Sequence, residues 1–128
     1  LFDFPSCLKL KDIIKEVYEN KGIVSAVCHG PSALLNITLS NGKYLVDGLK
    51  ITSRTVEEET QNDKVSKEKI LEKFPILLED ELKKQGAIFT KGEPFTGHIE
   101  VSDRLVTGQG VPSTSPLAKE VLKMLSSR

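Results

Sequence analysis

The sequence predicts an α/β fold, a mostly parallel sheet with helices on its faces, and three neighbouring patterns support that prediction. Residues 23–27 form an almost continuous apolar run, as expected of a strand covered on both faces. An amphipathic helical pattern precedes this run over residues 6–20, and another follows it from Ser32 to about Leu39. A helix, a buried strand and a second helix in succession are typical of an α/β sheet.

The rest of the chain continues the alternation of strands and helices. Asn41-Gly42 and Asp47-Gly48 are turn signals. The elements expected after them are a short strand over 49–52, an exposed loop and helix over 61–73, a helix opened by Phe74-Pro75 and closed by Gly86, a strand over 87–90, a hairpin over 98–107, and a last helix from Ser115-Pro116. This order predicts a hairpin at one sheet edge, near the C-terminal end of the chain.

Composition narrows the class of protein. A length of 128 residues suits one domain, residues 1–128, and 18 basic against 18 acidic residues give no net charge. Nucleic acid and anionic membrane surfaces are therefore not expected partners. Two cysteines form no disulfide framework, and no secretory leader is visible, so a cytoplasmic location is expected. Two histidines exclude most multi-histidine metal sites, and no phosphate loop or dinucleotide fingerprint is present, so no cofactor is expected.

Cys28 is the candidate nucleophile. It lies between the end of the strand over 23–27 and a helical pattern, which is the arrangement of a nucleophile elbow. Ala26 and Gly30, two positions before and after it, leave room for a strained backbone. Helical N–H groups that point toward the sulfur are expected to lower the pKa of the thiol. The alternative is a small apolar cysteine at a strand end, which is how most free cysteines behave.

Three consecutive carboxylates, Glu57 to Glu59, follow the expected strand over 49–52. Sites in open α/β sheets form at the carboxyl ends of strands, so one of the three is a functional candidate. The alternatives are a solvated face, or a first helical turn in which the helix dipole favours acidic residues. His98 is expected on the outer face of a strand, in a structural role.

Five segments together resemble one family: GIVSAVCHGP over 22–31, VDGLKIT over 46–52, Glu57 to Glu59, LLED over 77–80, and LVTGQ over 105–109. The chain resembles the PfpI-like superfamily, with its class I glutamine amidotransferase-like fold, in the branch of glutathione-independent glyoxalase III enzymes and heat-inducible chaperones. The resemblance implies a flavodoxin-like three-layer sandwich. It also implies a catalytic group of Cys28, His29 and Glu59, with Glu58 as the other candidate for the acid.

The resemblance further implies a reaction that converts methylglyoxal, a 2-oxoaldehyde, to lactate without glutathione or metal. Cys28 would form a hemithioacetal, and His29 would move a proton through an enediolate. Two other functions stay open: a stress chaperone or redox-sensing protein in which Cys28 is oxidised, and a cysteine peptidase or amidase on the same fold.

The start of the chain indicates a piece of a longer protein. Leu1-Phe2-Asp3-Phe4-Pro5 has no methionine and places two phenylalanines where a natural terminus would expose them. The resemblance implies that central strands and a glutamate beside the cysteine lie before residue 1. We therefore expect a C-terminal portion of one domain, whose partners are the N-terminal portion, on the same or a separate chain, and a second copy in a homodimer.

Overall fold

The computed structural model describes residues 1–66 and 69–128, and it confirms the α/β class. The strands are β1 (Val24–Val27), β2 (Lys50–Ile51), β3 (Ile88–Phe89), β4 (Ile99–Ser102) and β5 (Leu105–Gly108). The α-helices are α1 (Leu8–Glu19), α2 (Val56–Ser66), α3 (Leu78–Lys84) and α4 (Thr114–Ser126). Short 3-10 helices are η1 (Phe4–Ser6), η2 (Gly30–Leu34), η3 (Ile70–Lys73) and η4 (Val111–Ser113).

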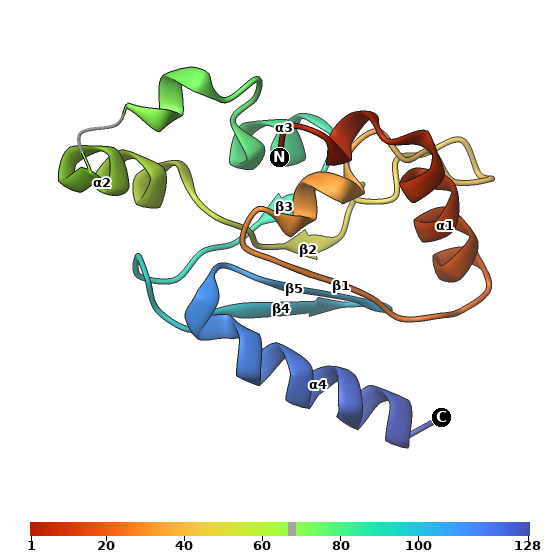
Figure 1. Cartoon of the computed structure of the whole chain (residues 1–128). Helices are drawn as coiled ribbons and strands as arrows, with labels where there is room; N and C mark the ends of the chain where they lie inside the picture. Colours follow the sequence, from red (N-terminus) through yellow and green to blue (C-terminus); the bar gives the residue numbers. More distant parts are fainter. Residues whose placement is uncertain (67–68) are drawn as a thin grey trace.

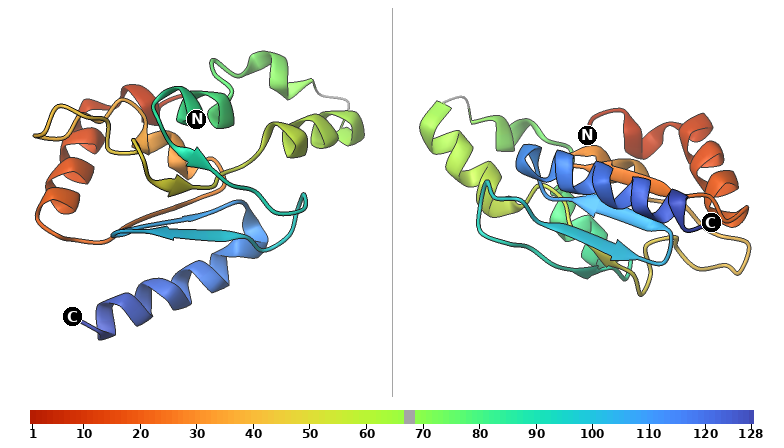
Figure 2. Two further views of the ribbon diagram at one scale, coloured as in Figure 1. Left: turned by 180° about the vertical axis from the view of Figure 1, so that it is seen from behind. Right: turned by 90° about the horizontal axis from the view of Figure 1, so that it is seen from below.

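The strands divide between two small sheets, where the sequence predicted one mostly parallel sheet. In the first, of order β1-β5-β4, β1 runs parallel to β5 and β4 runs antiparallel to it. In the second, β2 and β3 are parallel. Figure 1 shows α4 on one side of the first sheet, with α1, α2, α3 and the second sheet on the other side, and Figure 2 shows the same arrangement from behind. The expected hairpin is present as β4 and β5.

The core lies between the helices and the two sheets. Its most buried members are apolar side chains of η2, β2, α3 and β5, with relative exposures of 1% or less for Leu34, Ile51, Leu82 and Leu105. The predicted turns are also present, because Gly42 and Gly48 have φ angles of +84° and +77°, which glycine adopts most readily. No helix in the described ranges combines the length and the apolar character that crossing a membrane requires.

Two predicted helices are wrong in extent. The helix expected to run to about Leu39 is only the 3-10 helix η2, because Asn36 adopts a φ of +62°. The Asn36 N–H donates to Gln85 Oε1 at 2.9 Å, and Asn36 Oδ1 accepts from Gln85 Nε2 at 2.8 Å. This tertiary contact overrides the helical pattern. Phe74 is extended, as residues before proline prefer, and α3 begins only at Leu78.

The exposed segment predicted over 61–73 holds the second half of α2 and the short helix η3. Residues 67 and 68 of that prediction lie outside the described residues. Helix α2 begins before the predicted segment, at Val56, and its first turn carries all three glutamates. This first turn is the part of α2 that contributes to the candidate site.

Candidate active site

Cys28 directly follows β1, and its backbone is held by hydrogen bonds on both sides. It has a φ of +63°, a left-handed conformation that non-glycine residues rarely adopt. Its N–H donates to the carbonyl oxygen of Gly108 at 3.0 Å, and its own carbonyl oxygen accepts the Arg54 N–H at 2.8 Å. Three parts of the chain therefore meet at Cys28: the end of β1, the end of β5 and the segment after β2. Their hydrogen bonds can maintain the strained backbone of Cys28.

Gly108 permits this close approach. A Cβ atom at position 108 would lie 2.9 Å from the Cβ of Ser113 and 3.1 Å from a methyl group of Val27. A larger residue would push β5 away from β1 at the point where the Cys28 N–H binds. The small residue at this position thus helps to fix the position of the cysteine.

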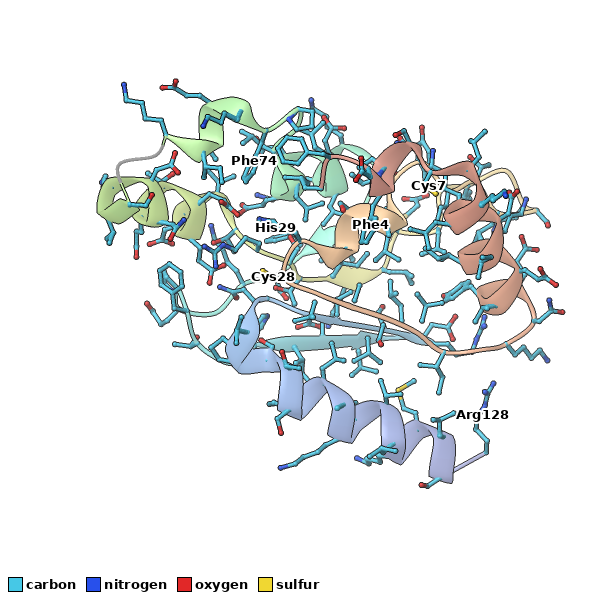
Figure 3. The ribbon with its side chains drawn as sticks, viewed as in Figure 1. Phe4, Cys7, Cys28, His29, Phe74 and Arg128 are labelled. Carbon is cyan, nitrogen blue, oxygen red and sulfur yellow. The ribbon has the colours of Figure 1, made fainter. Side chains whose placement is uncertain are left out.

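His29 and Glu59 contact each other. His29 Nε2 lies within hydrogen-bonding distance of Glu59 Oε1, and the imidazole packs edge-on against the ring of Phe74 with centroids 5.6 Å apart. Glu59 lies in the first turn of α2 and is only 6% exposed. Figure 3 shows Cys28 and His29 beside each other after β1, with Phe74 beyond His29 and Cys7 distant on the side of α1. The loop after β1 and the first turn of α2 thus bring together Cys28, His29 and Glu59, the group that the family resemblance implied.

Glu58, the other candidate for the acid, faces elsewhere. Its Oε1 accepts hydrogen bonds from the N–H and hydroxyl of Thr55, at 3.0 and 3.1 Å, while the Glu58 N–H donates to Thr55 Oγ1 at 3.1 Å. This reciprocal pair is a capping box at the start of α2. The other carboxylate oxygen of Glu58, Oε2, accepts the Phe95 N–H at 2.8 Å. The Thr-x-x-Glu spacing over 55–58 is a sequence signal that could have assigned Glu58 to this cap.

The pKa of the Cys28 thiol is raised, contrary to the lowered pKa that the sequence predicted. Burial is the largest cause, and the negative charges of Glu59 and Glu58 act in the same direction. The positive charge of Arg54 and a backbone hydrogen bond from His29 oppose it without overcoming it. Because the pKa is raised above the ordinary value of a thiol, the thiol form predominates at neutral pH.

Sequence reasoning gave Arg54 no role, yet its guanidinium contacts the group directly. Arg54 Nε donates to Glu59 Oε1 at 3.2 Å, the same oxygen that His29 contacts. A small cavity of about 10 Å³, room for about one water molecule, lies against these three side chains. The signal for Arg54 was its position directly between the strand β2 and the three glutamates.

His98 is half-buried, where the sequence predicted an outer face. Its Nε2 lies 2.9 Å from Thr90 Oγ1, and its backbone N–H donates to Ser113 Oγ at 3.0 Å. Both partners hold the loop between β3 and β4 in place, which fits the predicted structural role. Among residues 1–66 and 69–128, no group of three or more histidine, cysteine or acidic side chains is placed to hold a metal ion.

Comparison with known proteins shows which family this chain belongs to. Residues 3–124 match the model of the DJ-1/PfpI family. The chain belongs to that family. It is 35% identical to the glutathione-independent glyoxalase HSP31 of Saccharomyces cerevisiae, over 99% of the chain and 54% of that protein. It is 34% identical to glyoxalase 3 of Candida albicans, over 95% of the chain and 52% of that protein.

The fold of these family members is similar as well. The crystal structure of glyoxalase III from Candida albicans superposes with a TM-score of 0.83 at 30% identity, over 95% of this chain and 51% of that one. The chain therefore spans about half the length of the relatives it matches, and it corresponds to their C-terminal half. The resemblance stated from the five sequence segments is confirmed at the level of the family.

Proposed function

We propose that this chain carries the reactive cysteine of a glutathione-independent glyoxalase that converts methylglyoxal to lactate. The observation that carries the proposal is the cluster of Cys28, with its left-handed backbone, and the His29–Glu59 pair. The relatives named as glyoxalases, one of them as a glutathione-independent glyoxalase, support the choice of substrate class. A half-buried thiol followed directly by an oriented imidazole is an arrangement suited to nucleophilic attack on a carbonyl carbon.

In the proposed reaction, the Cys28 sulfur bonds to the aldehyde carbon of methylglyoxal while its proton is transferred to His29. The raised pKa of the thiol makes this base necessary, because little thiolate is present at neutral pH. Glu59 occupies Nε2 of the ring, which leaves Nδ1 to exchange protons. The left-handed turn at Cys28 is the nucleophile elbow of this proposal.

His29 passes the thiol proton to the aldehyde oxygen, which completes the hemithioacetal and restores the base. The imidazole then removes the hydrogen of the former aldehyde carbon, and the electron pair forms an enediolate with the neighbouring ketone carbon. Return of the proton to that neighbouring carbon gives a thioester of lactate. Water hydrolyses the thioester, so that methylglyoxal and one water yield lactate and the free thiol. The backbone N–H groups of His29 and Gly30 are the proposed donors to the developing oxyanion, because the Cys28 N–H already donates to Gly108.

Methylglyoxal consumption by single-cysteine variants tests the proposal. The natively purified protein is assayed without glutathione beside its Cys28→Ala and Cys7→Ala variants. Cys28→Ala is expected to lose at least 99% of the activity, a loss of about 10²-fold, because no other group can form the covalent intermediate. Cys7→Ala, which removes an exposed thiol on the far side of η2, is expected to retain it. Activity that survives in Cys28→Ala would overturn the proposal.

We further propose that the complete protein covers the free edge of β1 with a strand from its remaining portion. Among the residues that the structure describes, strand β1 pairs with β5 alone, and an apolar groove of about 380 Å³ lies along β1. The groove is lined by all four residues of β1 and by Phe4, Leu10, Ile14, Gly30, Ala33 and Leu34. A free edge beside apolar side chains is a site for pairing with another strand. The matched relatives have about as many residues again outside the region they share with this chain, which is enough to supply that strand.

A further inference from the structure

Arg54 lies beside Cys28, His29 and Glu59, and no step of the proposed reaction uses it. Its side chain is only 15% exposed, although arginine is seldom buried without a partner. Its Nε donates to Glu59 Oε1 at 3.2 Å. That oxygen is the one His29 contacts, so the carboxylate is held from two sides. Losing Arg54 would free the carboxylate to turn away from the imidazole.

Two further contacts hold Arg54 itself in place. Its backbone N–H donates to the carbonyl oxygen of Cys28 at 2.8 Å, which ties the end of β2 to the end of β1. Its guanidinium carbon lies 5.1 Å from the centroid of the Phe95 ring, a cation–π contact. The Phe95 N–H in turn donates to Glu58 at 2.8 Å, so the ring is held by the cap of α2. The position of the guanidinium is therefore fixed by three separate parts of the chain.

The charge of Arg54 opposes the other charges around the cysteine. Burial and the carboxylates of Glu59 and Glu58 disfavour a negative sulfur, whereas the guanidinium favours it. Among the influences that lower the pKa of Cys28, the charge of Arg54 is the largest. Within residues 1–66 and 69–128, Arg54 makes its side-chain hydrogen bond through Nε alone. Within these residues, Glu59 is the one carboxylate that pairs with the guanidinium of Arg54.

We propose that Arg54 is a positioning residue of this site, which holds Glu59 against His29 and keeps a positive charge beside the Cys28 sulfur. The proposal rests on Cys28 being the nucleophile of the proposed function. It adds that the reactivity of the cysteine depends on a side chain from the end of β2 as well as on its own loop.

Alkylation of Cys28 by iodoacetamide across a range of pH measures this effect without any substrate. Peptide mass spectrometry restricts the measurement to the peptide that contains Cys28, in the natively purified protein. Arg54→Gln is expected to move the alkylation midpoint to higher pH, and each unit of that move lowers the rate at neutral pH about tenfold. Arg54→Lys keeps the charge and is expected to remain close to the unsubstituted protein. Circular dichroism establishes that each variant is folded.

Arg104→Gln is the matched control. Arg104 also stacks on an aromatic ring, that of Tyr18, with 4.3 Å between guanidinium carbon and centroid, but it lies at the opposite end of β5. Removing the same charge there is expected to leave the alkylation profile unchanged. A profile that moves equally in Arg104→Gln would mean a general effect of net charge and would overturn the proposal.

Two other results would also overturn it: a folded Arg54→Gln with an unchanged profile, or an Arg54→Lys variant as slow as Arg54→Gln.

If Arg54→Gln does not fold, Phe95→Leu decides, because it removes the stacked ring without a change of charge. Phe95→Leu is expected to move the midpoint in the same direction by less, and an unchanged profile would count against the role of Arg54. A normal alkylation shift in a protein that does not consume methylglyoxal would sustain this proposal while the proposed function failed.

Discussion

At the scale of single residues, Glu58 and Glu59 are neighbours in the sequence with different surroundings. Glu59 contacts His29 and Arg54, whereas Glu58 caps α2 through Thr55 and binds the Phe95 N–H. The two carboxylates are both nearly inaccessible to solvent, with relative exposures of 6% and 1%. Their roles can therefore be separated by the same conservative substitution at each position.

Glu59→Gln is expected to lower the turnover of methylglyoxal about 10- to 100-fold with little change in stability, because the imidazole loses the partner that orients it. Glu58→Gln is expected to lower the free energy of unfolding by about 1–2 kcal/mol, because the cap of α2 weakens, while folded protein keeps most of its turnover. Steady-state rates and urea unfolding of both variants provide the comparison. The reverse pattern would assign the acid to Glu58.

The sequence predicted which residues of the candidate site lie together better than it predicted their surroundings. Cys28, His29 and the glutamate run were identifiable because residue type and position after a strand are local properties. The raised pKa of Cys28 was not, since its causes are burial and the charges of Glu59 and Glu58, which come from parts of the chain distant from Cys28 in the sequence. The split of the sheet and the short extent of η2 likewise depend on tertiary contacts, such as that between Asn36 and Gln85.

At the scale of elements, α3 positions the start of α2. Glu79, in the first turn of α3, accepts the Val56 N–H at 3.1 Å and pairs with Lys83 at 2.8 Å. Burial alone would raise its pKa, but the hydrogen bonds from Lys83 and Val56 and the charge of Lys91 lower it overall. The ionised carboxylate therefore links the two helices that border the site.

Glu79→Gln is expected to reduce the free energy of unfolding by about 1–3 kcal/mol at pH 7. Because the pKa of Glu79 is lowered in the folded protein, its contribution is present above the unfolded-state value, about 4.3, and is lost as the pH falls. The difference between the two proteins should therefore shrink below pH 4. Urea unfolding at pH 7 and in acid measures it, and a difference independent of pH would contradict the account.

Tyr18 links α1 to the turn between β4 and β5. Its hydroxyl donates to Asp103 Oδ2 at 2.7 Å, and the Arg104 guanidinium lies over its ring. Burial first, and then the hydrogen bond and charge of Asp103, raise the pKa of Tyr18 to about 12. The folded protein holds the phenol proton of Tyr18 more tightly than the unfolded chain does. Tyr18 therefore lowers the free energy of unfolding once its hydroxyl ionises in the unfolded chain.

The free energy of unfolding is therefore expected to fall between pH 10 and 12, by on the order of 2 kcal/mol from this residue. Tyr18→Phe should remove that part of the loss, at the expense of stability near neutral pH, where the hydrogen bond to Asp103 is missing. Tyr44→Phe, at an exposed tyrosine, is the control and should retain the alkaline loss. Equal alkaline behaviour of the two variants would refute the assignment to Tyr18.

At the scale of the whole molecule, β1 is the open side of the structure. In a parallel pair, alternate amides of a strand face each neighbour, and the N–H groups of Val24 and Cys28 face β5. Those of Ser25 and Val27 therefore face the free edge, beside the apolar groove. In the proposed complete protein, these two amides pair with a strand from the remaining portion.

Hydrogen exchange tests this pairing. The amides of Ser25 and Val27 are expected to be protected in the natively purified protein and to exchange fast in the isolated 128-residue polypeptide, while the amide of Cys28 is the internal reference. Protection in the isolated polypeptide that rises with its concentration would instead indicate a second copy on the edge. Rapid exchange in the native protein would rule out the proposed strand.

Cys28 is proposed to support the turnover of methylglyoxal and not merely to capture it. The measurement that tests it most directly is the lactate formed by the natively purified protein with excess methylglyoxal and no glutathione, read by proton magnetic resonance. The expected amount of lactate equals the methylglyoxal consumed and is many times the molar amount of protein, and Cys28→Ala is expected to give none above background. Consumption limited to about one methylglyoxal per protein, without lactate, would contradict it and would indicate a cysteine that is modified without turnover.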